Sequence, residues 1–144
     1  MSSGLYLVAG VGGTTIALPA ETVEAVVRIT ALVPVPCAPP TIIGLATIRS
    51  RVFTLLDTAL IAGEGTAQSQ LMAISSIEGH GYGLALERVE DVIAIDRFGP
   101  APAGLTSAWA QLVDGMADHQ GRAILLVRPE AIVACAGTAL SAAA

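Results

Sequence analysis

Two cysteines and two histidines are the residues of this chain best suited to nucleophilic or metal chemistry. Cys37 and Cys135 lie 98 positions apart, and neither belongs to a CxxC pair of the kind that holds zinc. His80 and His119 stand close to glycines at predicted turns, where histidines are usually solvated. We therefore predict no metal and no cofactor. A Cys–His pair that meets only in the fold stays open as a minor alternative.

Two other segments look like catalytic or nucleotide-binding motifs at first sight. Residues 87–91 group three carboxylates, and paired carboxylates can act as acid and base, but charges beside a half-buried strand usually form its solvated face. Residues 79–83 (GHGYG) lack the spacing of a dinucleotide-binding fingerprint, which joins a strand to a helix. We therefore predict that the chain is not an enzyme and acts by binding proteins.

Composition narrows the class of partner. Hydrophobic residues make up 53% of the 144 residues and charged residues 13%, which excludes disorder. A net charge of −5 with no lysine argues against nucleic acid as a partner. Mean hydropathy is high at +0.71, but apolar runs such as 42–48 are far shorter than the ~20 residues of a spanning helix, so we expect no membrane insertion. The start of the chain lacks a signal-peptide pattern, which predicts a cytoplasmic location.

A repeat is the most informative feature of the sequence. Leu18, Glu21, Val23, Glu24 and Val26 recur 66 positions later as Leu84, Glu87, Val89, Glu90 and Val92. At an offset of 71, Gly44-Leu45-Ala46, Phe53 and Leu55 match Gly115-Met116-Ala117, Ile124 and Leu126. A longer loop between 98 and 114 explains the change of offset. The chain is therefore predicted to be a duplication, in which Arg51 and Arg122 share a structural role.

Within each repeat, apolar residues alternate with a period near two, which is typical of strands. We predict strands over 5–9, 14–18, 26–30, 42–48, 51–56, 70–77, 82–86, 92–96, 112–118 and 122–127. Glycines in 10–13 and 78–81 suit hairpin turns. The expected fold class is all-β with short helices, as two small five-stranded Greek-key or SH3-like barrels that close on themselves.

Helices and boundaries complete the prediction. A short helical turn is expected over 57–61, and Pro129 suits the first position of a closing helix over 129–137, beyond which the chain should fray. The polar segment 63–70 is the expected link between the halves. This gives one domain, 1–144, with subdomains near 14–62 and 71–127.

Segment 38–57, APPTIIGLATIRSRVFTLLD, resembles the CheW-type coupling domain of bacterial chemotaxis. Members carry a pattern close to N-A-P-P-x-I-x-G-V-x-N-L-R-G-x-x-x-P-V-I-D-L. The matching residues are Ala38, Pro39, Pro40, Ile42, Gly44, Arg49 and Asp57. Residues 115–117 and 121–126 resemble the family's G-V-A…G-R-L-L-I-L-L ending. The resemblance covers nearly the whole chain.

The resemblance implies two intertwined five-stranded barrels related by a pseudo-two-fold axis. It also implies a non-enzymatic adaptor that joins the cytoplasmic tips of chemoreceptors to the regulatory domain of a CheA-type histidine kinase. In the family one barrel packs against that kinase domain, and an apolar groove between the barrels takes the receptor hairpin. The protein would then be cytoplasmic and recruited to membrane-bound receptor arrays.

Four departures from the family pattern bear on partner contacts. Thr47 stands where the family pattern has Asn, Ser50 where it has Gly, and Thr54 where it has Pro. Ala25 stands in a strand position where members commonly have Glu. If the family Arg works beside that Glu, Arg49 has lost a charged neighbour. The candidate protein-binding residues are Ala25, Pro39, Pro40, Gly44, Thr47, Arg49, Ser50 and Asp57.

Several alternatives stay open. Arg49 is either a directional contact or an ordinary exposed cation, and Asp57 either a contact or the N-cap of the short helix. The chain could serve another CheA-like pathway, could have lost coupling through its departures, or could be a small cysteine-dependent enzyme.

Overall fold

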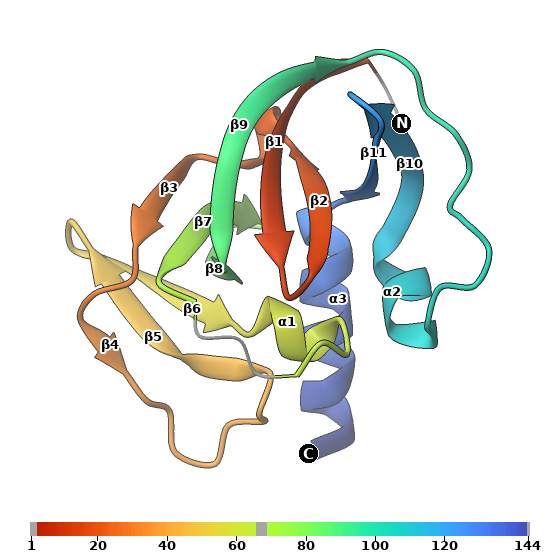
Figure 1. Ribbon diagram of the computed structural model, residues 1–144. Coiled ribbons are helices and arrows are strands. Elements are labelled where there is room, and N and C mark those ends of the chain that lie inside the picture. Colours follow the sequence, from red (N-terminus) through yellow and green to blue (C-terminus); the bar gives the residue numbers. More distant parts are fainter. Residues whose placement is uncertain (1–2, 66–68, 144) are drawn as a thin grey trace.

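The computed structural model describes residues 3–65 and 69–143, and about half of these residues lie in strands (Figure 1). The strands are β1 (Gly4–Val11), β2 (Thr14–Pro19), β3 (Ala25–Arg28), β4 (Leu32–Val33), β5 (Ile42–Ile48), β6 (Arg51–Leu56), β7 (Leu71–Ile77), β8 (His80–Leu86), β9 (Arg88–Ile95), β10 (Val113–His119) and β11 (Arg122–Val127). The helices are η1 (Ala20–Thr22), α1 (Thr58–Ile61), α2 (Ser107–Leu112) and α3 (Pro129–Ala143).

Two mixed sheets exchange strands between the halves of the chain. Sheet A has the order β10-β11-β2-β1-β9, and sheet B the order β3-β7-β8-β6-β5-β4. Sheet A therefore takes the β1–β2 hairpin from the first half, and sheet B takes the β7–β8 hairpin from the second. The ribbon shows the curled sheets side by side, with α3 running beside α1 and α2 (Figure 1).

The exchanged strands follow the duplication residue by residue. Val26 of β3 pairs with Ala73 of β7. Their counterparts 66 positions away, Val92 of β9 and Leu7 of β1, pair in turn. Each half thus completes the sheet of the other half by the same pairing.

The strand pairing also follows the second repeat offset, that of 71 residues. The β5–β6 hairpin has a register shift between Ile42 and Gly44, and the β10–β11 hairpin has one between residues 113 and 115, which lie 71 positions further on. The parallel pair Leu55–Gly83 likewise corresponds to the pair between residues 126 and 17. The structure therefore has the pseudo-two-fold relation that the repeat predicts.

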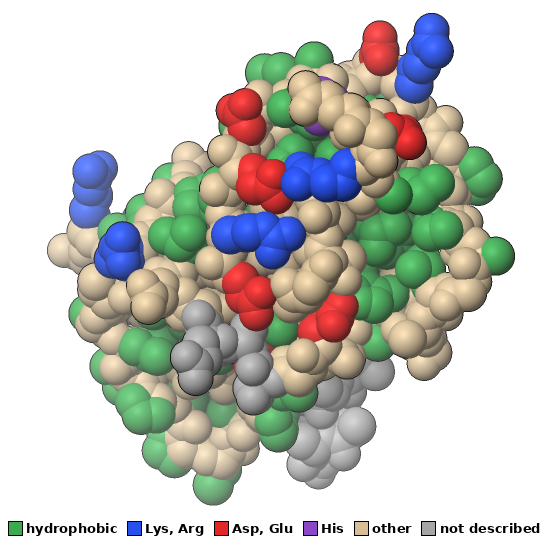
Figure 2. Space-filling view, viewed as in Figure 1, with side chains coloured by type: hydrophobic (Ala, Val, Ile, Leu, Met, Phe, Trp, Pro, Cys, Tyr) green, Lys and Arg blue, Asp and Glu red, His purple; other side chains and the backbone are tan. Residues whose placement is uncertain are grey.

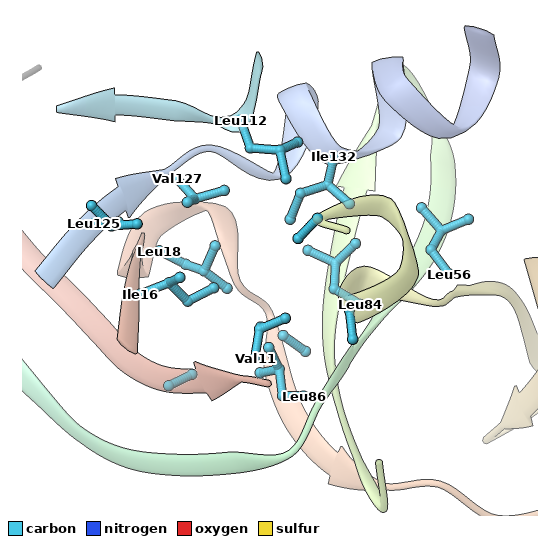
Figure 3. Packing of buried hydrophobic residues seen from close by; sticks show 14 of the residues in the cluster. Val11, Ile16, Leu18, Leu56, Leu84, Leu86, Leu112, Leu125, Val127 and Ile132 are labelled. Atoms are coloured by element: carbon cyan, nitrogen blue, oxygen red, sulfur yellow. The ribbon is translucent and has the colours of Figure 1, made fainter. Parts of the chain in front are cut away.

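The hydrophobic residues form three clusters. One cluster lies within sheet A around Tyr6 and Ile124, and another within sheet B around Phe53 and Met72. The largest cluster joins both sheets to the three α-helices (Figure 3). In it Leu18 and Val127 from sheet A, Leu56 and Leu84 from sheet B, Leu112 from α2 and Ile132 from α3 pack together. This shared core makes the sheets one packed unit.

The predicted fold class is confirmed, and three strands have the predicted bounds, 42–48, 51–56 and 122–127. The sequence missed α2 and the two-residue strand β4. The closing helix does not end at Gly137 but continues to Ala143, because the surrounding alanines favour helix and one glycine costs only about 1 kcal/mol. The subdomain bounds 14–62 and 71–127 remain a prediction. They describe the two repeats along the chain, because each sheet contains strands from both halves.

Gly44→Ala tests how closely β4 packs on β5. A methyl group at Gly44 would lie 2.5 Å from the carbonyl oxygen of Val33, so the backbone of β4 would have to move. We expect the free energy of unfolding in urea to fall by about 1–3 kcal/mol. The control is Gly13→Ala, where no atom of the described residues lies within 4 Å of the added methyl group. Equal effects of the two substitutions would contradict the close packing.

Candidate functional site

The eight candidate residues fall into two groups at opposite ends of the β5–β6 hairpin. Pro39, Pro40, Gly44 and Asp57 lie where β5 begins and β6 ends, and Thr41 joins the two segments because its carbonyl accepts a hydrogen bond from the Asp57 N–H at 2.8 Å. Thr47, Arg49 and Ser50 lie at the opposite end, where the side chain of Glu24, the residue before Ala25, contacts Arg51.

The first group mostly has structural roles. Pro39 is buried and its carbonyl accepts a hydrogen bond from the Ile42 N–H at 3.0 Å, whereas Pro40 is exposed. Both prolines follow trans peptide bonds. Gly44 is buried under β4. Of this group, only Pro40 has the exposure of a partner contact.

Asp57 caps α1, so the structure realises the capping alternative. Its side chain is 5% exposed, and Oδ1 accepts a hydrogen bond from the Leu60 N–H at 3.1 Å. Burial raises the pKa of this carboxyl group, and the hydrogen bond from Leu60 opposes that shift. The carboxylate therefore holds the helix at the end of β6 and does not present a charge to solvent.

Arg49 and Ser50 form the two-residue turn between β5 and β6. Their φ angles are 50° and 68°, and the flanking residues Ile48 and Arg51 pair with each other. Both central residues having positive φ defines a type I′ turn, which strongly favours glycine at its second position. The equivalent turn of the second half has Gln120 and Gly121, so only the first half places serine where the backbone disfavours it.

An ion pair joins this turn to the start of β3. The Arg51 Nη1 lies 3.1 Å from Glu24 Oε2, and the guanidinium lies 4.9 Å from the centre of the Phe53 ring. Ser76 on β7 donates a hydrogen bond of 2.6 Å to Glu24. These contacts lower the pKa of the Glu24 carboxyl group, the Ser76 hydrogen bond most of all, followed by Arg51. The pair thereby connects Arg51, the first residue after the turn, to Glu24, the residue before Ala25.

We call this group of exposed residues the hairpin-end surface: Ala25, Thr47, Arg49, Ser50 and Val52. Val52 pairs with Thr47 and is 58% exposed, which is high for a valine. Arg49 forms no ion pair within residues 3–65 and 69–143. The surface therefore combines apolar side chains with one unpaired cation.

The equivalent end of sheet A has a different chemistry. The positions that correspond to Ala25, Thr47, Arg49 and Val52 hold Asp91, Asp118, Gln120 and Ala123. Acidic and basic side chains gather over the middle of the face formed by β9, β1 and β2 (Figure 2). The two ends thus share a backbone but present different surfaces, one apolar and cationic, the other anionic.

Sequence reasoning missed Glu24, Val52 and Ser76 as parts of this end. The repeat could have identified Glu24, because Glu24 corresponds to Glu90 and Arg51 corresponds to Arg122. The structure confirms the shared structural role predicted for the two arginines, since Arg122 Nη2 lies 2.8 Å from Glu90 Oε1.

A groove of about 770 Å³ lies elsewhere, between the start of β1, η1 and the start of α3. Its floor includes Tyr6 and Leu126, and its rim carries Glu21, Asp114 and Arg128. Arg128 pairs with Asp114 at 2.5 Å. None of the eight candidate residues lines this groove, which borders sheet A alone and not both sheets.

Cysteine chemistry finds little support in the geometry. Cys37 is an exposed free thiol, and Cys135 is a partly buried one that donates a hydrogen bond to Gln111 at 3.4 Å. Burial raises the pKa of the Cys135 thiol, which makes it a poorer nucleophile. The described residues contain no cluster of three or more His, Cys, Asp or Glu side chains that could hold a metal ion. Among them, no helix is long and apolar enough to cross a membrane.

Fold and site together define a duplicated β-module with an exposed surface suited to protein contacts. The family described as CheW-like domain matches residues 5–136, and the chain belongs to this family. Among solved structures, the scaffolding protein TtCheW from Thermoanaerobacter tengcongensis shares 23% sequence identity and a TM-score of 0.77, over 88% of this chain and 89% of that one. A comparison with curated protein sequences gave no significant match.

The two equivalent turns allow a test of backbone strain. Ser50→Gly should raise the free energy of unfolding by about 1 kcal/mol, because glycine adopts positive φ without a steric penalty. Gly121→Ser should lower it by about the same amount. Chemical denaturation measures both. If Ser50→Gly left stability unchanged or lower, the strain assigned to this turn would be wrong.

Asp57 predicts a pH effect with a definite sign. Because the pKa of this group is raised in the folded protein, the folded state retains the proton longer, and stability falls as pH rises through the carboxyl range. Asp57→Asn keeps the cap and should remove this loss, so its advantage over the wild type should grow with pH. Asp57→Ala should cost about 1 kcal/mol. Thermal unfolding at a series of pH values measures the dependence of stability on pH. If this dependence were the same in Asp57→Asn as in the wild type, the raised pKa of Asp57 would be contradicted.

Proposed function

We propose that the protein is a non-enzymatic adaptor that couples chemoreceptors to a CheA-type histidine kinase in bacterial chemotaxis signalling. Membership of the CheW-like family supports this proposal, as does a fold similar to that of a protein described as a scaffold. In this role it works in the cytoplasm, is recruited to membrane-bound receptor arrays, and binds the regulatory domain of the kinase and the cytoplasmic tips of the receptors.

The observation that carries the proposal is the difference between the two equivalent hairpin ends. Their strands, turns and ion pairs correspond, so architecture alone does not require their surfaces to differ. At the first end, the strained turn contains unpaired Arg49, and exposed Val52 lies two residues after it. Strain and exposed apolar area gather where a surface has been kept for binding.

The candidate residues take different roles in this proposal. Arg49 supplies a directional contact to a carboxylate of the partner, with Ala25, Thr47 and Ser50 around it. Pro40 is a peripheral contact. Pro39, Gly44 and Asp57 act indirectly, because they fix the far end of the hairpin.

A second candidate is an adaptor of another CheA-like pathway. The observation that favours it is Ala25, which is exposed at the start of β3 and gives Arg49 no carboxylate from that position. An adaptor with this surface would choose partners that bring the carboxylate themselves. No observation of this kind favours a cysteine-dependent enzyme.

Charge reversal at Arg49 tests the proposal. We expect Arg49→Glu to weaken binding to the kinase regulatory domain or to a receptor-tip fragment from the same genome by about tenfold or more, through loss of one charge-assisted contact and repulsion. Isothermal titration calorimetry measures the dissociation constant. The control is Gln120→Glu at the equivalent turn position, which should change it less than about twofold.

Two results would count against the proposal. Absence of wild-type binding to both partners at tens of micromolar would remove the coupling function. Equal effects of Arg49→Glu and Gln120→Glu would show that the hairpin-end surface is not the contact.

A further inference from the structure

The ion pair at the hairpin end exists twice. Glu24 and Arg51 of the first half correspond to Glu90 and Arg122 of the second through the two repeat offsets, and the pairs measure 3.1 and 2.8 Å. All four side chains are at least a quarter exposed. Isolated exposed pairs contribute little to stability, so their presence at equivalent positions indicates a geometric role.

Each pair reaches across a hairpin that belongs to the other half. Between β3 and β6 lie β7 and β8, and there Ser76 donates its hydroxyl hydrogen bond to Glu24. On β8, a Cβ atom at Gly81 would lie 2.6 Å from the Phe53 ring, the ring over which the Arg51 guanidinium stacks. The absence of a side chain at Gly81 therefore leaves room for the Phe53 ring, on which the Arg51 guanidinium rests.

The two pairs are not held equally. In the second half Glu90 also pairs with Arg88 at 3.4 Å, and Arg88 donates a further hydrogen bond to Thr15. The position equivalent to Arg88 in the first half is Thr22, whose hydroxyl donates to the Pro19 carbonyl instead. Glu24 therefore has a single arginine partner, so the first pair depends on Arg51 alone.

The first pair also lies directly beside the hairpin-end surface. Arg51 is the residue after the strained turn, and Glu24 is the residue before Ala25. The two segments are 27 residues apart in sequence, and this pair connects them at the tip. If the ion pair were broken, β3 and the β5–β6 hairpin would keep their own strand pairings. The start of β3 and the turn would then be free to move relative to each other.

We propose that Glu24 and Arg51 are positioning residues that hold the two segments of the hairpin-end surface in the arrangement a partner recognises. This inference rests on the proposed function. It adds two residues, Glu24 and Arg51, that the family pattern does not specify. Their contribution is geometric, so it depends on the contact between two opposite charges and not on a charge presented to the partner.

The experiment compares partner affinity of the full chain for four variants. Glu24→Gln and Arg51→Gln should each weaken binding to the partner that recognises the wild type by about threefold to fivefold. The reversed pair, Glu24→Arg with Arg51→Glu, should restore affinity to within about twofold. Arg122→Gln is the matched control in the other half and should leave affinity unchanged within about twofold. The difference in affinity between the wild type and the two single variants should shrink at high salt, where exposed ion pairs are screened.

The alternatives give different results. If Arg51→Gln and Arg122→Gln change affinity equally, the first pair has only a structural role and the inference is overturned. If the reversed pair binds as weakly as the single variants, contact between opposite charges does not hold the surface in place, which also overturns the inference. A wild-type protein that binds neither partner contradicts the proposed function, whereas wild-type binding with an unaffected Arg51→Gln contradicts this inference alone.

Discussion

The exchange of the β1–β2 and β7–β8 hairpins between the sheets is the constraint on which the rest of the structure depends. The first strand of each exchanged hairpin pairs with a strand of the other half, β1 with β9 and β7 with β3, so neither half completes a sheet by itself. The apolar faces that the two sheets turn toward each other, together with α1, α2 and α3, then form one shared core. Because burial of this core supplies most of the favourable free energy, the halves are stable only together.

A duplicated scaffold allows one of its two copies to change its surface. The backbone of each hairpin end is held by the other half, by a matching bulge and by a matching ion pair, so side chains at the tips are free to diverge. At one tip they are apolar and cationic, and at the other they are acidic. Comparison of the two tips thus separates residues that serve the fold, such as Arg122, from residues such as Arg49 that the fold does not require.

Local features of the fold could be predicted from the sequence, whereas non-local ones could not. Strands 42–48 and 51–56 follow from apolar alternation around a two-residue turn, and the repeat predicts their counterparts. The β3–β7 pairing joins residues 43 to 49 positions apart, and no local pattern encodes it. For the site, the family pattern found Arg49 but grouped it with Pro39 and Asp57, which are buried at the opposite end of the hairpin. Only the folded hairpin separates contact residues from supporting ones.

Native-state hydrogen exchange tests most directly whether the two halves form one unit. The slowest amides of β1 and β9 in sheet A, and of β3 and β7 in sheet B, should share one free energy of opening, equal to that of global unfolding. A set of amides confined to one sheet that opens at a free energy well below that of the other would contradict the account, because it would mean that the sheets unfold independently.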